Sequence, residues 1–135
     1  MLKTAERART APRTSHKDAA IAFLRMTSSG RVRQAYEQYV GQHFKHHNPH
    51  YPGDAESLAT GMEEMALKHP DLEFHVERAL EDGDLVAVHS RVRLHPKERE
   101  FVTTHIFRFA GDRIVEFWDL AMEQPTNSPN ENGLF

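Results

Sequence analysis

The segment from Phe101 to Met122 constrains the fold of this chain more than any other. Residues 101–109 are rich in aromatic and β-branched side chains, and residues 114–120 have a similar composition. The intervening residues 110–113, Ala-Gly-Asp-Arg, are typical of a tight turn. The segment therefore predicts two antiparallel strands joined as a hairpin.

Strand parity places one histidine and one carboxylate on the apolar side of this hairpin. His105 shares its face with residues of the first strand, namely Thr103, Phe107 and Phe109. Asp119 shares its face with residues of the second strand, namely Val115 and Phe117. A carboxylate on an apolar face is costly unless it is paired or has a function. Because both lie at similar distances from the turn, we expect His105 and Asp119 to face one another, walled by Phe107, Phe117 and Trp118.

The overall composition excludes several classes of protein. With 39% hydrophobic and 27% charged residues, the chain is typical of one globular domain and not of a disordered segment. A net charge of -3 gives no overall case for binding nucleic acid or an anionic membrane. The absence of cysteine excludes disulfides, cysteine-ligated zinc and thiol catalysis, and fits a cytoplasmic location. No apolar run approaches the roughly 18 residues of a membrane span.

Helical patterns occupy the first half of the chain. Residues 1–14 predict a flexible basic extension without the apolar stretch of a secretory signal, with a transit peptide as the alternative. A single domain is then expected over residues 15–135. Apolar periodicity predicts two helices between Ser15 and about Val40, broken at residues 28–30. A third helix is expected to begin at Asp54 or Ser57 and to end near residue 69.

Four histidines stand between the second and third helices, namely His43, His46, His47 and His50. Their spacing would place them on one face of a continuous helix, but Pro49 ends any helix there. We therefore expect no metal site, and we expect His43, His46 and His50 in a surface loop. The turn His47-Asn48-Pro49 is different, because it could aim two hydrogen-bonding side chains into a pocket. Its alternative is a purely structural turn.

The remaining segments predict a sheet that precedes the hairpin. Residues 71–80 and 85–94 alternate in polarity and are separated by the turn 81–84. Together with the hairpin they form a meander of four strands, which predicts an α+β fold with a curved antiparallel or mixed sheet and N-terminal helices enclosing a pocket. The face of His89 stays open, because its neighbours on the strand are both apolar and charged. The polar tail 123–135 either folds back over an opening or is a loose end.

This order of elements carries several motifs, namely His47-Asn48-Pro49, Asp84–Arg91, His105–Phe109, Gly111–Asp119 and Asn132–Phe135. The combination resembles the SnoaL-like proteins, relatives of polyketide cyclases in the nuclear transport factor 2-like superfamily, from about Ser15 onward. The resemblance implies a cone-shaped α+β barrel with a deep apolar pocket, commonly dimeric through its sheet. It also implies that Asp119 is the general acid/base of an aldol-type ring closure and that His105 assists. His47, Asn48 and His89 match pocket-lining positions.

Three hypotheses of function follow. The first is a cofactor-independent cyclase, lyase or isomerase that acts on a small apolar carbonyl compound, with Asp119 as the base. Burial against Phe117 and Trp118 is expected to raise the pKa of Asp119, and His105 or Asn48 would donate to the enolate oxygen. The second hypothesis is a non-catalytic pocket protein, and the third is a scaffold or dimerisation module. In each case we expect no metal, no organic cofactor and a homodimer.

A hydrolytic alternative exists in the same superfamily. Epoxide hydrolysis there uses aspartates and an arginine to activate water, and Arg91, Arg93 and Arg108 are available in this chain. Strand parity places Arg108 on the face opposite His105, which argues against this reaction.

Overall fold

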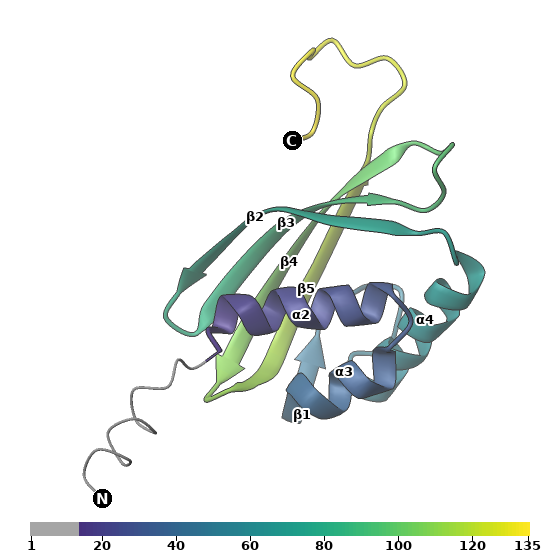
Figure 1. Cartoon of the computed structure of the whole chain (residues 1–135). Helices are drawn as coiled ribbons and strands as arrows, with labels where there is room; N and C mark the ends of the chain where they lie inside the picture. The colour runs from purple at the N-terminus through teal and green to yellow at the C-terminus, as the bar shows by residue number, and fades with distance from the viewer. Residues whose placement is uncertain (1–13) are drawn as a thin grey trace, which may run out of the picture.

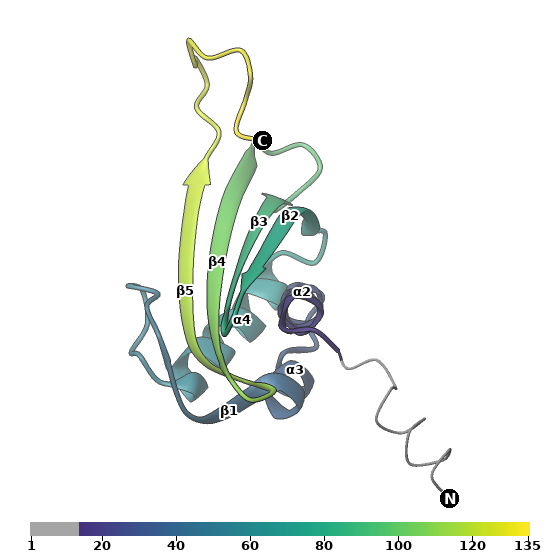
Figure 2. The same ribbon diagram turned by 90° about the vertical axis from the view of Figure 1, so that its left-hand side faces the viewer.

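The structure is a computed structural model, and it describes residues 14–135. Within these residues, three helices lie against one five-stranded curved sheet (Figures 1 and 2). In chain order the elements are α2 (His16–Ser28), α3 (Val32–Tyr39), β1 (Val40–His46), α4 (Ala55–Lys68), β2 (Glu73–Asp82), β3 (Leu85–Arg93), β4 (Glu100–Ala110) and β5 (Arg113–Glu123). The basic extension lies outside the described residues except for Thr14. None of the described helices is long and apolar enough to cross a membrane.

The helices begin and end where the local chemistry predicts. The hydroxyl of Ser15 accepts the backbone N–H of Asp18 at 3.0 Å and caps α2, while Asp54 caps α4 through the N–H of Ser57 at 2.9 Å. Between α2 and α3 the chain turns at Gly30, whose φ of 90° is readily adopted only by glycine. The predicted helix starts at Ser15 and Asp54 and the predicted break at residues 28–30 are therefore confirmed.

The sheet has the strand order β1-β5-β4-β3-β2, with β1 parallel to β5 and the other neighbours antiparallel. The predicted meander is confirmed, but strand β1 is a correction, because the sequence pattern suggested helix to Val40 and then a loop. Two irregularities hide this strand. Its register against β5 shifts between Val40 and Lys45, and His43 has a φ of 59° in the left-handed region. Regular alternation is lost, and pairing with β5 helps to hold the segment extended.

The β4–β5 hairpin has the predicted centre, because His105 lies directly opposite Asp119 in the antiparallel register. A bulge nearer the turn changes one detail of the predicted face. Phe109 pairs with Ile114 and Arg108 pairs with Glu116, so that Val115 is the extra residue. Ile114 is consequently fully buried beside Phe117, whereas Val115 is only partly buried.

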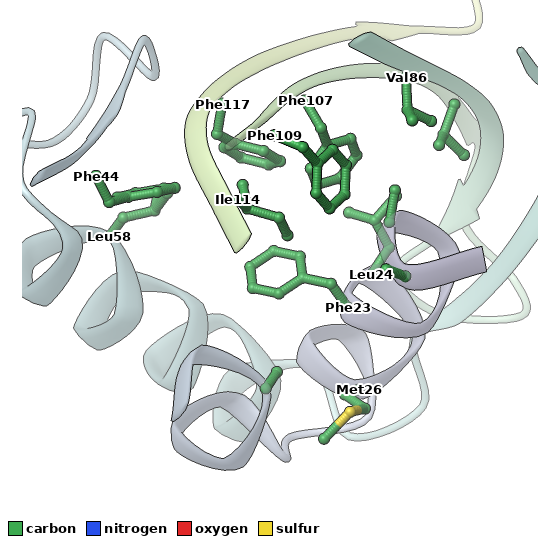
Figure 3. Packing of buried hydrophobic residues seen from close by; sticks show 14 residues of the cluster. Phe23, Leu24, Met26, Phe44, Leu58, Val86, Phe107, Phe109, Ile114 and Phe117 are labelled. Atoms are coloured by element: carbon green, nitrogen blue, oxygen red, sulfur yellow. The ribbon is translucent and has the colours of Figure 1, made fainter. Parts of the chain in front are cut away.

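The helices cover one face of the sheet, here called the inner face, and the opposite face is called the outer face. Phe23 of α2 packs edge-on against Phe107 and Phe117, with ring centroids 6.0 and 6.1 Å away (Figure 3). On β3 the inner face carries Val88 and Ser90, both fully buried. The aromatic cluster holds the concave side of the sheet against α2.

The alternation along β3 decides the position of His89, which projects from the outer face. The C-terminal tail folds back onto this same face. The guanidinium of Arg91 lies over the ring of Phe135, 4.1 Å from its centroid, and the ring of His89 lies 5.8 Å from it. The tail therefore covers part of the outer face.

Candidate active site

A cavity of about 330 Å³ lies between the inner face of the sheet and helices α2 and α4. This volume is at the lower end of the range of about 300–1,000 Å³ for small-molecule pockets. The lining is mainly apolar and comes from α2, α4, the sheet and the segment before β2: Leu24, Thr27, Ser28, Met62, Met65, Ala66, Leu72, Phe74, Val92, Leu94, Phe101, Thr103, His105, Asp119 and Ala121. The cavity thus contacts both members of the pair in the hairpin.

Asp119 is held by two side chains from different parts of the chain. Its Oδ1 lies 3.1 Å from Nε2 of His105, and its Oδ2 accepts a hydrogen bond of 2.8 Å from Nδ2 of Asn48. The side chains of His105 and Asp119 are 11% and 22% exposed, so the pair is largely shielded from solvent. A carboxylate and an imidazole in contact at the wall of an apolar cavity can exchange a proton with a bound molecule.

The pKa of Asp119 differs from expectation. Burial raises this pKa, but the hydrogen bond and charge of His105, together with the hydrogen bond from Asn48, outweigh burial and lower it below its usual value. The predicted upward shift was therefore wrong in sign. The prediction rested on apolar burial alone, whereas the loop after β1 also brings the Asn48 side chain to the second carboxylate oxygen as a hydrogen-bond donor.

His46 holds the backbone of Asn48, the residue that donates to Asp119. Its Nδ1 accepts the backbone N–H of Asn48 at 3.1 Å, and its Nε2–H donates to the carbonyl of Pro52 at 2.6 Å. These two contacts require the neutral tautomer with the proton on Nε2. His46 is only 5% exposed, so its expected place in a surface loop is a correction. No sequence pattern indicates this role, because residues 40–46 lack the regular alternation of a strand.

The turn at residues 47–49 sends its two polar side chains to different places. Asn48 reaches Asp119 on the inner side. His47 stacks on Trp118, with ring centroids 5.0 Å apart, and its Nε2 lies 2.7 Å from Oε2 of Glu116. Glu116 and Trp118 project from the outer face. His47 and Trp118 therefore do not wall the acid–imidazole pair.

Several other candidates are also placed by the structure. The rings of His105 and Phe117 are stacked, with centroids 5.3 Å apart, and Phe107 and Phe117 are fully buried behind the pair. His89 contacts Arg78 on the outer face. Arg108 is on that face too, paired with Glu116 at 3.2 Å and with Asp84 at 3.4 Å, away from Asp119. Among residues 14–135 no group of three histidine or acidic side chains could hold a metal ion.

Thr103 is a pocket residue that the sequence analysis named only as a neighbour of His105. It lies two residues before His105 on the inner face of β4, and it lines the cavity. The signal was available in strand parity, which places both side chains on one face. Its position in a cavity wall depends on α2 and α4, which meet the sheet only in the folded chain.

The chain is thus an α+β protein in which helices cover one face of a curved sheet, and an acid–imidazole pair lies in the wall of an apolar cavity between them. Residues 20–117 match the SnoaL-like domain, and the chain belongs to this family. The matched range includes Asn48 and His105 and ends two residues before Asp119. No protein of curated function matches the sequence significantly.

Similar solved structures share the fold at low sequence identity. An NTF2-like protein from Cytophaga hutchinsonii is 12% identical with a TM-score of 0.66, covering 84% of this chain and 95% of that one. IdmH from Streptomyces antibioticus, a candidate polyketide cyclase, is 23% identical with a TM-score of 0.61, covering 79% and 91%. A SnoaL-like polyketide cyclase from Agrobacterium tumefaciens is 16% identical with a TM-score of 0.59, covering 82% and 93%.

Proposed function

We propose that this protein is a cofactor-independent enzyme that performs acid/base chemistry on a small, mainly apolar carbonyl compound, as an aldol-type cyclase, lyase or isomerase. The observation that carries this proposal is the contact of 3.1 Å between His105 and Asp119 in the wall of an apolar cavity. The polyketide cyclases among the similar structures support it at the level of the family.

In the proposed reaction the Asp119 carboxylate takes a proton from the carbon next to the substrate carbonyl. The electron pair of that C–H bond moves into an enolate, whose oxygen needs a hydrogen-bond donor. Asn48 has a second N–H on Nδ2 beyond the one given to Asp119, and His105 is the other available donor. The enolate carbon then attacks a second carbonyl, which closes a ring, and the resulting alkoxide takes the proton back from Asp119. In an isomerisation, protonated Asp119 instead returns the proton to a different carbon of a conjugated dienolate.

The lowered pKa of Asp119 limits which substrates suit this base. An ionised carboxylate is in the correct state to accept a proton, but a low pKa makes it a weak base. We therefore infer that the substrate carbon is activated by more than one carbonyl or by an aromatic ring. A simple ketone would react slowly.

Exchange of carbon-bound hydrogen tests the proposal without knowledge of the natural substrate. 2-Tetralone, whose C1 lies between the carbonyl and the aromatic ring, and 2-acetylcyclohexanone, whose C2 lies between two carbonyls, would be incubated with the protein in D₂O, and the loss of the proton at that carbon would be followed by NMR. We expect the wild-type protein to accelerate exchange and Asp119→Asn to lose about 10²-fold or more of this acceleration. Asp84→Asn is the matched control, because Asp84 is an exposed acid paired with Arg108 on the outer face. Equal exchange by Asp119→Asn and wild type would refute Asp119 as the base.

A non-catalytic binding protein is the second candidate, and one observation favours it. Two hydrogen bonds hold Asp119 ionised, which also suits a fixed acceptor that orients a ligand hydroxyl. The same experiment separates the two functions. Tight binding of a ketone without accelerated exchange of any carbonyl compound would favour binding alone.

A further inference from the structure

Three buried polar atoms of the described residues have no hydrogen-bond partner: Ser90 Oγ, Thr103 Oγ1 and His105 Nδ1. Their residues are 0%, 9% and 8% exposed. Buried polar atoms in folded proteins are nearly always paired, because an unpaired one loses its hydrogen bonds to water without replacement. Three such atoms in one region of an otherwise apolar core therefore need a common explanation.

The three residues are neighbours on the inner face of the sheet. Ser90 of β3 lies directly opposite Thr103 of β4, and His105 follows two positions along the same strand. Side chains directly opposite in an antiparallel pair have Cβ atoms roughly 4.5–5.5 Å apart. Thr103 and His105 both line the cavity, and Ser90 lies beside Thr103. The unpaired atoms thus belong to a polar strip on the inner face, which runs from His105 to Thr103 at the cavity wall and on to Ser90 beside it.

We propose that Thr103, supported by Ser90, is a second binding position for the ligand that recognises an oxygen other than the reacting carbonyl. The proposal rests on the pocket function proposed above and deepens it by naming a feature of the ligand. Hydroxyl groups can both donate and accept, so a ligand hydroxyl or carbonyl satisfies Thr103 Oγ1. The other two hydroxyl residues of the lining, Thr27 and Ser28, already donate to the carbonyl of Leu24, whereas Thr103 Oγ1 has no partner.

The geometry of the strand sets the distance between the two ligand oxygens. Residues two apart on an antiparallel strand are separated by roughly 6.8 Å. The oxygen held at Thr103 is therefore about one six-membered ring away from the carbonyl that meets His105 and Asp119. The expected ligand class is a compact ring compound with a carbonyl at one end and a hydroxyl or second carbonyl across the ring.

Two commercially available probes differ only in the oxygen that would be held at Thr103. 6-Hydroxy-1-tetralone carries a hydroxyl across the aromatic ring from its ketone, and 1-tetralone lacks it. Calorimetry on the full chain would measure the dissociation constant of each probe. We expect the wild type to prefer the hydroxylated probe by about tenfold, Thr103→Val to bind the two within about twofold, and Ser90→Ala to lie between, since a buried hydrogen bond is of this magnitude.

Thr27→Val is the matched control for the loss of a pocket hydroxyl. Thr27 is buried and lines the same cavity, but its hydroxyl already donates to the carbonyl of Leu24 at 3.1 Å. This variant is expected to change both affinities together and to keep the preference. Without ligand, Thr103→Val should melt at or above the wild-type temperature, because it removes an unpaired buried hydroxyl while keeping the shape of the side chain.

Several outcomes would overturn the proposal. These are equal wild-type affinity for the two probes, no binding of either probe, loss of the preference in Thr27→Val as in Thr103→Val, or a Thr103→Val protein that keeps the preference. A lower melting temperature for Thr103→Val would indicate that a buried water satisfies the hydroxyl, and would also count against the ligand. Hydrogen exchange of 2-acetylcyclohexanone by the wild type reports separately on the enzymatic function. If the wild type shows no exchange but keeps its preference for the hydroxylated probe, the proposed enzymatic function is refuted and the binding position at Thr103 is supported.

Discussion

Nδ1 of His46 accepts the backbone N–H of Asn48 across 3.1 Å and so fixes the residue that binds the second oxygen of Asp119. Because Nε2 of the same ring donates to Pro52, the imidazole bridges both ends of the loop after β1. His46 is 5% exposed and does not line the cavity. It is therefore a positioning residue, which acts on Asp119 through Asn48.

Replacing His46 tests this positioning role. His46→Phe keeps a buried ring but removes both contacts, so Asn48 should lose its fixed direction. We expect kcat for hydrogen exchange to fall about tenfold, comparable to one misplaced hydrogen bond, while KM stays within about twofold. His46→Gln, which has both a donor and an acceptor, should recover part of the rate. His50→Phe, an exposed change in the same loop, is the control. A rise in KM with unchanged kcat would contradict the assignment of His46 as a positioning residue.

Asn48→Ala should change the pH dependence of the reaction. Removing the donor to Oδ2 takes away one of the contacts that lower the pKa of Asp119, so this pKa should rise. The acidic limb of the pH–rate profile would then move to higher pH, because the carboxylate must be ionised to act as a base. Asn132→Ala in the exposed tail is the control. An unchanged acidic limb would show that Asn48 does not influence the base.

Acid stability provides a second measurement of the same carboxylate. The pKa of Asp119 is lower in the folded protein than its value of about 3.9 in an unfolded chain. Its interactions therefore stabilise the fold above this unfolded value, and their contribution is lost as the pH falls through the folded value. We expect Asp119→Asn to be less stable than wild type by about 1–3 kcal/mol at pH 7 and the difference to vanish in strong acid. Urea unfolding across pH measures it, and a constant difference would contradict the pairing.

Adjacent residues on opposite faces of β5 should respond differently. Phe117 is fully buried against His105 and Phe23, so Phe117→Ala is expected to cost about 3–5 kcal/mol of unfolding free energy and to impair exchange. Trp118→Ala removes a ring that stacks on His47 on the outer face. It should cost less and leave the exchange rate of the folded protein unchanged. A loss of exchange in Trp118→Ala would show that Trp118 contributes to the pocket, against its position on the outer face.

The homodimer expected from the family resemblance stays a prediction. The outer face of β5 presents Leu120 and Met122, which are 60% and 56% exposed. If two copies associate through this face, the double change Leu120→Glu and Met122→Glu should convert a dimer into a monomer. Sedimentation velocity measures the result. Leu67→Glu on α4, where Leu67 is 84% exposed, is the control for added charge alone. A wild-type monomer at micromolar concentration would refute the prediction.

Local patterns in the sequence determined the helices, the meander and the pairing of His105 with Asp119. Each depends on neighbours within a few residues, namely caps, periodicity or a tight turn, so a single segment carries enough information. A hairpin register is set by its own turn, and here the bulge lies between the turn and the pair without moving them apart. The family resemblance used the same local motifs.

Only the tertiary structure decided strand β1, the outer position of His47 and His89, and the direction of the pKa shift of Asp119. Strand β1 exists because β5, distant in sequence, pairs with an irregular segment. The hydrogen bond from Asn48 joins residues 71 positions apart, and together with His105 it outweighs burial and lowers the pKa of Asp119. Interactions of this kind depend on which segments meet in space, and the periodicity of a single segment does not contain that information.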